Sequence, residues 1–70
     1  METTIQVGDS TRGYDTAVVA VTRGGRYQLI ECYGRKTVCR KLVALANRHE
    51  DTYVTSGGDV LTIRIQPARN

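Results

Sequence analysis

One stretch of the chain, residues 34–50, has the periodicity of an amphipathic helix, and we identify no second stretch of this kind. At 100° per residue its apolar side chains share one broad arc. They are Val38, Cys39, Leu42, Val43, Leu45 and Ala46. The opposite arc holds Thr37, Arg40, Lys41, Ala44, Asn47 and Arg48. The rest of the chain must therefore supply the surface that covers a single apolar helix face.

The charges at the ends of this predicted helix oppose its dipole. Arg35, Lys36, Arg40 and Lys41 crowd the start, where backbone N–H groups favour anions, and Gly34 is the best available N-cap. Glu50 and Asp51 lie at the other end, where bases are favoured. Each misplaced charge costs roughly 0.3–1 kcal/mol. Either the bases serve an anionic partner, or they are good helix formers on a solvated face.

The remaining pattern predicts strands. Residues 3–7 alternate as a short first strand, and residues 16–23 and 26–33 form a hairpin around Gly24-Gly25. Residues 52–55 and 60–66 flank a second turn, and residues 67–70 form a frayed tail. The predicted fold is a single α+β domain over residues 1–70, in the order β-ββ-α-ββ, with one amphipathic helix on one face of an antiparallel β-sheet.

A two-residue turn at Gly24-Gly25 fixes the register of the first hairpin. Val21 then pairs with Gln28, Val19 with Ile30 and Ala17 with Cys32, on the face toward the helix. The predicted core comprises Ile5, Val19, Val21, Ile30, Val38, Leu42, Leu45, Leu61, Ile63 and Ile65. The outer face then shows Val18, Ala20, Tyr27, Leu29 and Tyr33.

This outer face has two interpretations. It is a candidate interface for a partner or for a homodimer, because one helix cannot cover both faces of a sheet. Alternatively it is an ordinary half-polar surface, since scattered exposed apolar residues are common. Arg23 and Arg26 face each other across the turn, which favours either a nearby anion or two side chains that splay into water.

Length and charge limit the class of protein. Seventy residues bury a core of marginal stability, and a net charge of +3 is mild for a nucleic-acid-binding protein. The charge is uneven, because residues 35–48 carry five bases and no acid. We find no apolar run of membrane-spanning length and no signal-peptide pattern, so we expect a soluble, cytoplasmic protein.

Catalysis and metal binding lack a motif. Six residues separate Cys32 from Cys39, which is not a zinc or redox spacing, and His49 is the only histidine. In a reducing cytosol the two thiols are most simply small core side chains. We expect no enzyme activity, no metal and no cofactor, because no nucleophile–base pair or carboxylate pair is evident.

Two binding functions remain. In the first, the chain docks on a protein or nucleoprotein complex through its outer sheet face or its basic helix. In the second, it binds nucleic acid directly, with the helix on phosphates and Tyr27 or Tyr33 stacked on bases. The candidate binding residues are Arg35, Lys36, Arg40, Lys41, Arg48, Arg23, Arg26, Val18, Tyr27, Leu29 and Tyr33.

The predicted architecture resembles small phage-encoded inhibitors, the anti-CRISPR proteins among them. A hairpin over residues 17–33, a helix over residues 36–50 and a closing strand over residues 61–65 carry the resemblance. It implies a small α+β domain that blocks a large host complex by surface occlusion. Such proteins share an architecture rather than a motif, so the resemblance transfers no individual residue role.

Overall fold

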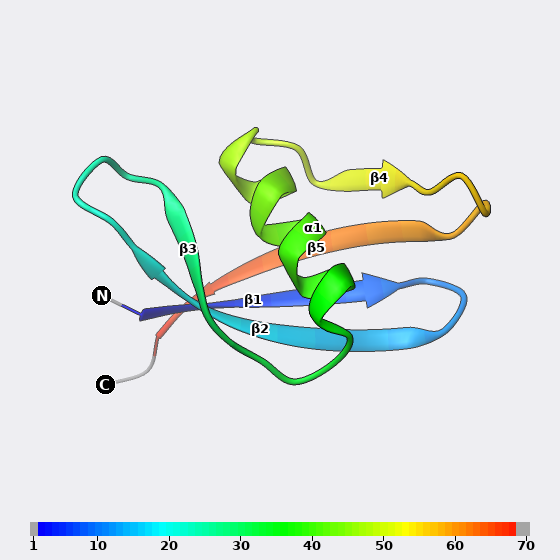
Figure 1. The fold of residues 1–70 in the computed structure, drawn as a ribbon, viewed down its shortest axis with the longest axis horizontal. Helices are drawn as coiled ribbons and strands as arrows, with labels where there is room; N and C mark the ends of the chain where they lie inside the picture. The colour runs from blue at the N-terminus through cyan, green and yellow to red at the C-terminus, as the bar shows by residue number, and fades with distance from the viewer. Residues whose placement is uncertain (1, 69–70) are drawn as a thin grey trace.

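The computed structural model describes residues 2–68, in which five strands and one helix form an antiparallel sheet with a single helical layer (Figure 1). The elements are β1 (Glu2–Asp9), β2 (Gly13–Val21), β3 (Tyr27–Cys32), α1 (Lys36–Asn47), β4 (Thr52–Val54) and β5 (Val60–Pro67). The strand order is β3-β2-β1-β5-β4, with every neighbouring pair antiparallel. The predicted α+β fold is confirmed. The predicted tail begins inside β5 with Pro67, and residues 69–70 lie outside the described residues.

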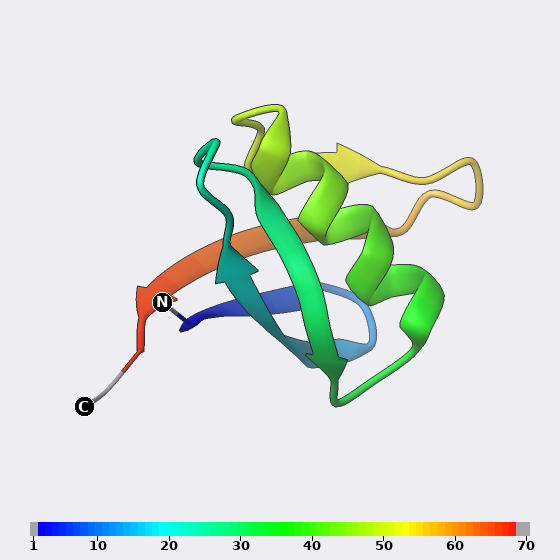
Figure 2. The ribbon, with the colours of Figure 1, turned by 60° about the vertical axis from the view of Figure 1, so that its left-hand side comes forward.

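The core lies between α1 and one face of the sheet, and no other element of the described chain covers the opposite face (Figure 2). Its largest fully buried side chains come from α1 and from two of the inner strands, β1 and β2: Ile5, Val7, Val19, Cys39, Leu42 and Leu45. The predicted core is therefore largely right. It is wrong at Ile30 and Ile65, whose side chains are 53% and 44% exposed, and Val21 is half-buried outside the core cluster.

The turn of the first hairpin is one residue longer than predicted. The Gly25 N–H donates to the Thr22 carbonyl, the Thr22 N–H donates to the Arg26 carbonyl, and Gly25 has a φ of 74°. This is a three-residue turn that ends in a left-handed glycine. The β4–β5 turn is built in the same way, with Thr55, Gly58 and Asp59 in the equivalent positions.

A β-bulge in β3 compensates for the longer turn. Ala17–Cys32 and Val18–Glu31 pair as predicted, whereas Val19 pairs with Leu29 because the register shifts between Val18 and Val19. A shift of one residue moves side chains to the other face of a sheet. Tyr27 and Leu29 therefore pack against the core beneath α1, and their predicted place on the outer face is wrong.

The helix is shorter than predicted at both ends. Arg35, not Gly34, is the N-cap, and it makes no side-chain capping hydrogen bond. At the other end the Glu50 N–H donates to Leu45 and the His49 N–H donates to Ala46, which is the Schellman arrangement. His49 takes the left-handed position with a φ of 57°, where glycine is usual.

A disulfide joins Cys32 at the end of β3 to Cys39 in α1, so the prediction of two unpaired thiols is wrong. The two Cα atoms are 6.1 Å apart, within the range that a disulfide spans. The spacing in sequence did not indicate this, because the loop of residues 33–35 turns the chain back and brings the first helical turn against β3. The bond ties the start of α1 to the edge of the sheet.

Replacing Leu42 with Ala should lower the free energy of unfolding by about 2–5 kcal/mol, because the side chain is completely buried between helix and sheet. Urea unfolding measures the change. Val54→Ala is the matched control, since Val54 is 60% exposed and its truncation should change stability little. Equal effects of the two substitutions would contradict the packing described here.

Reducing the disulfide should lower the free energy of unfolding by roughly 2–3 kcal/mol, because the bond restricts the unfolded chain. Urea unfolding with and without a phosphine reductant measures this difference. A Cys32→Ala/Cys39→Ala variant should unfold identically in both conditions. A wild-type protein that is indifferent to the reductant would refute the bond between Cys32 and Cys39.

Candidate docking surface

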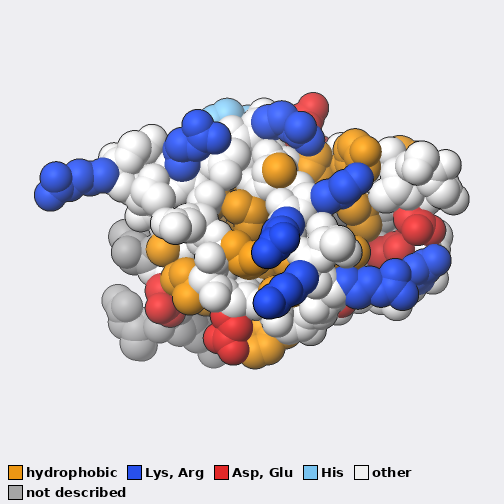
Figure 3. Space-filling view, in the orientation of Figure 1, with side chains coloured by type: hydrophobic (Ala, Val, Ile, Leu, Met, Phe, Trp, Pro, Cys, Tyr) orange, Lys and Arg blue, Asp and Glu red, His pale blue; other side chains and the backbone are white. Residues whose placement is uncertain are grey.

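The exposed face of α1 is the most basic surface of the described chain. Its cations, Arg35, Lys36, Arg40, Lys41 and Arg48, are all exposed. Figure 3 shows Lys and Arg side chains spread over the helix, while Asp and Glu gather at the margins of this view. Among residues 2–68 only Arg48 of this group forms an ion pair, with Glu50 at 3.0 Å.

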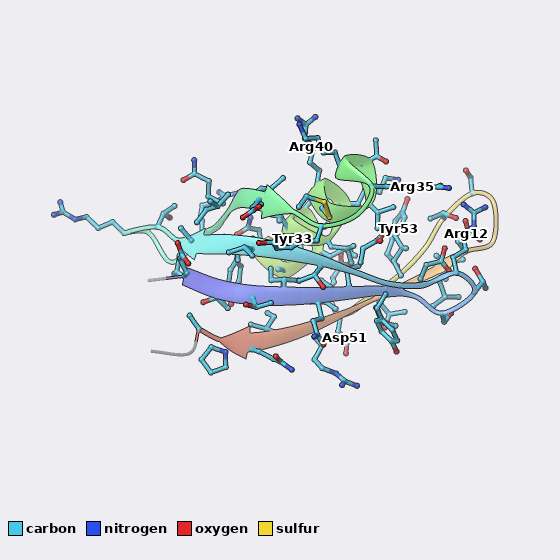
Figure 4. The ribbon with its side chains drawn as sticks, turned by 90° about the horizontal axis from the view of Figure 1, so that it is seen from below. Arg12, Tyr33, Arg35, Arg40, Asp51 and Tyr53 are labelled. Atoms are coloured by element: carbon cyan, nitrogen blue, oxygen red, sulfur yellow. A yellow bond between two sulfur atoms is a disulfide. The ribbon has the colours of Figure 1, made fainter. Side chains whose placement is uncertain are left out.

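The start of α1 has no side-chain cap within the described chain, and the nearest carboxylate is that of Asp15, which lies against Gly34. Its first turn contains no acid, its N-cap offers no side-chain acceptor, and Arg40 points away from the sheet into solvent (Figure 4). The unpaired N–H groups and the adjacent cations both favour an anion at this end. This confirms the predicted conflict between the charges and the helix dipole at the N-terminal end.

The two arginines of the first hairpin lie at its tip, away from the helix start. Arg23 is inside the three-residue turn and Arg26 closes it, so both are exposed at the end of the hairpin. The extra turn residue changes the predicted geometry, because Arg26 pairs with Thr22 and Arg23 no longer faces it. Neither arginine forms an ion pair with a described residue.

The outer sheet face is more polar than predicted. Tyr27 and Leu29 are absent from it, and Val18 is only partly exposed. Tyr33 is 63% exposed, and its hydroxyl donates to Glu31 at 3.0 Å, which raises the pKa of Tyr33 and keeps the phenol protonated. Tyr14 lies over Gly8, where a Cβ would collide with its ring. The predicted apolar patch therefore changes its members, because Leu29 is packed against the core and Ile30, 53% exposed, is at the surface instead.

A groove runs beside α1, on the side toward β4. One hollow of about 300 Å³ is lined by Lys41, Ala44, Leu45, Arg48 and Tyr53. The Lys41 ammonium lies 4.8 Å from the centre of the Tyr53 ring, a cation–π distance. A second hollow of about 370 Å³ adjoins the helix start, and Lys41 lines both. The first hollow thus combines cationic walls with an apolar and aromatic floor, whereas the second is also lined by the carboxylates of Asp9, Asp15 and Asp59.

The second hollow ends at a charged cluster that joins the two loops on that side. Asp9 accepts hydrogen bonds from the backbone and the hydroxyl of Thr11, and Arg12 lies between Asp9 and Asp59 at 4.0 and 3.9 Å. The hydrogen bonds from Thr11 and the charge of Arg12 lower the pKa of Asp9 below its ordinary value. The charge of Arg12 is therefore balanced by two carboxylates of the same chain.

Three contributors to these surfaces are not evident from the sequence. Tyr53 has no predicted role beyond its place in a strand, yet it forms the groove floor under Lys41. Asn47 was assigned to the solvated arc, yet its side-chain amide binds both the N–H and the carbonyl of Tyr27. The cysteine pair was the third. Each depends on a contact between distant parts of the chain, which periodicity does not reveal.

Other kinds of site have little basis in residues 2–68. No group of three or more His, Cys, Asp or Glu is arranged there to hold a metal ion. Within the same residues, no helix has the length and apolar character needed to cross a membrane. Comparison of the chain with known protein families, with curated proteins and with solved structures gives no match. The function must therefore be argued from the surfaces themselves.

Replacing Asp9 with Asn should destabilise the protein most at neutral pH. A carboxyl whose folded pKa is lowered contributes stability above its unfolded pKa, and that stability is lost as the pH falls through the folded value. The difference in free energy of unfolding between wild type and variant should therefore shrink below pH 3.8. Urea unfolding at several pH values measures it.

Asp51→Asn is the control, because Asp51 is exposed and lies outside the Arg12 cluster. A difference for Asp9→Asn that does not change with pH would contradict the assigned pKa shift.

Proposed function

We propose that this chain is a non-enzymatic binding module that docks on a protein or nucleoprotein complex through the basic face of α1. The observation that carries the proposal is the start of the helix. Arg35, Lys36 and Arg40 are exposed and form no ion pair with a described residue, and they surround a helix end that favours anions. This arrangement costs stability in the isolated chain and gains it when an acidic surface binds.

Blocking by occlusion belongs to the same proposal. It follows from the resemblance to phage-encoded inhibitors, for which a small rigid domain is sufficient. The Cys32–Cys39 disulfide supports the rigid part, because it fixes the first turn of α1 relative to β3. The cytoplasmic location predicted from the sequence stays a prediction. The disulfide weighs against it, because a reducing cytosol opens most protein disulfides.

Direct nucleic-acid binding is the second candidate. The spread of cations from the hairpin tip at Arg23 and Arg26 to the helix favours it, because phosphate backbones are contacted over long tracks. Base stacking has less support. Tyr27 packs against the core and Tyr33 is engaged by Glu31, so neither predicted tyrosine shares a groove with the helix cations. We therefore rank the protein or nucleoprotein target first.

Neutralising the helix start should abolish binding without harming the fold. In an Arg35→Gln/Lys36→Gln/Arg40→Gln variant the positive charges next to the helix N-terminus are removed, so its stability should equal or exceed that of the wild type. A pull-down from lysate of the source cell, with and without nuclease, measures binding. The wild type should recover one protein complex that survives nuclease, and the variant should not.

Arg64→Gln is the matched control, because Arg64 is exposed on the outer sheet face, opposite Gln6 and away from α1. It should recover the complex like the wild type. Recovery of nucleic acid alone, with a salt dependence that falls by roughly 0.7–0.9 per phosphate contact removed, would replace the first candidate with the second. Equal recovery by all three proteins would refute the role of the basic face.

A further inference from the structure

The two edges of the sheet are treated differently by the rest of the chain. At the β3 edge, the side-chain amide of Asn47 accepts from the Tyr27 N–H at 2.7 Å and donates to the Tyr27 carbonyl at 2.9 Å. It thereby occupies the outward backbone groups that another strand would bind. The bulge in β3 and the disulfide at Cys32 further disrupt a regular edge. A further strand is therefore obstructed at Tyr27 and at the bulge.

The β4 edge carries no such block among the described residues. The Asp51 carbonyl and the Thr55 N–H both bond toward β5, so by alternation the backbone groups of Thr52 and Val54 point outward. No hydrogen bond within residues 2–68 reaches these outward groups. Thr52 and Val54 are both exposed, and in Figure 1 β4 is the outermost strand on this side of the sheet.

The groove beside this edge selects the side chains of an occupant. A strand added to β4 lies about 4.8 Å from it. Its side chains on the helix side are then next to Tyr53 and under Lys41, which together line the hollow between α1 and β4. Arg48 lines the same hollow but forms an ion pair with Glu50, so Lys41 is the cation available to a ligand. A carboxylate at this position complements it.

We propose that an extended acidic segment of a protein partner binds as an antiparallel strand along β4, with its carboxylates beside Lys41. The inference rests on the proposed function and names how the partner is held. Backbone pairing at Thr52 and Val54 supplies affinity, and the groove supplies the preference for acids. A second copy of the chain fits less well, because pairing two β4 edges would bring Lys41 and Arg48 of one copy toward the same cations of the other.

The probe is an acetylated peptide of alternating Glu and Val, compared with a peptide of alternating Lys and Val. Nuclear magnetic resonance titration of the full chain should show binding of the Glu peptide only, with slowed exchange of the Thr52 and Val54 amides. In antiparallel pairing the Glu side chains face the helix, and the Val N–H groups face β4. Methylating the Val nitrogens should therefore weaken binding about tenfold or more. Methylating the Glu nitrogens is the matched control.

Val54→Pro removes one outward donor without breaking a bond to β5, so it should fold and lose the peptide. Val54→Thr keeps the donor and should bind. Absence of binding, equal binding of the Lys peptide, binding at the outer sheet face, or indifference to Val methylation would each overturn the β4 assignment. None of these outcomes decides the proposed function, which is tested separately by the pull-down with the Arg35→Gln/Lys36→Gln/Arg40→Gln variant. Conversely, peptide binding at β4 with no effect of that variant would overturn the proposed function alone.

Discussion

The packing of one helix on one face of the sheet is the interaction on which the remaining structure depends. Leu42 and Leu45 of α1 are buried against Ile5, Val7 and Val19, and the described chain has no second apolar layer. The core is therefore small, and the disulfide at the start of α1 strengthens the same contact. Every surface that faces away from this layer is either available for binding or must be protected against unwanted association.

Most of these remaining surfaces are protected against association by polar side chains or by side chains that cover the backbone. Thr and Gln side chains dominate the outer face, Tyr14 covers Gly8, and Asn47 closes the backbone of Tyr27 at the β3 edge. Exposed sheet edges are usually protected in this way, because unpaired strands promote association. Against that background, the unprotected β4 edge and the uncompensated cations of α1 are the exceptions. Lys41 of α1 and Tyr53 of β4 line the hollow between these two elements.

The charges divide into those that stabilise the fold and those that do not. Arg12 links Asp9 and Asp59 and so connects two loops that are far apart in sequence. Arg35 and Lys36, by contrast, oppose the helix dipole and form no ion pair with a described residue. Such a conflict between local charge and local structure is the pattern expected where a partner completes the surface.

The sequence alone determined the fold class, the helix and its apolar arc. Periodicity depends only on the spacing of apolar residues within one segment, and Leu42 and Leu45 of the predicted arc are buried in the structure. Only the tertiary structure decided which face carries Tyr27 and Leu29, since an added turn residue and a compensating bulge are not visible in a hydrophobic pattern. It also decided the Cys32–Cys39 bond and the open β4 edge, because both depend on distances between segments that the chain brings together only when it folds.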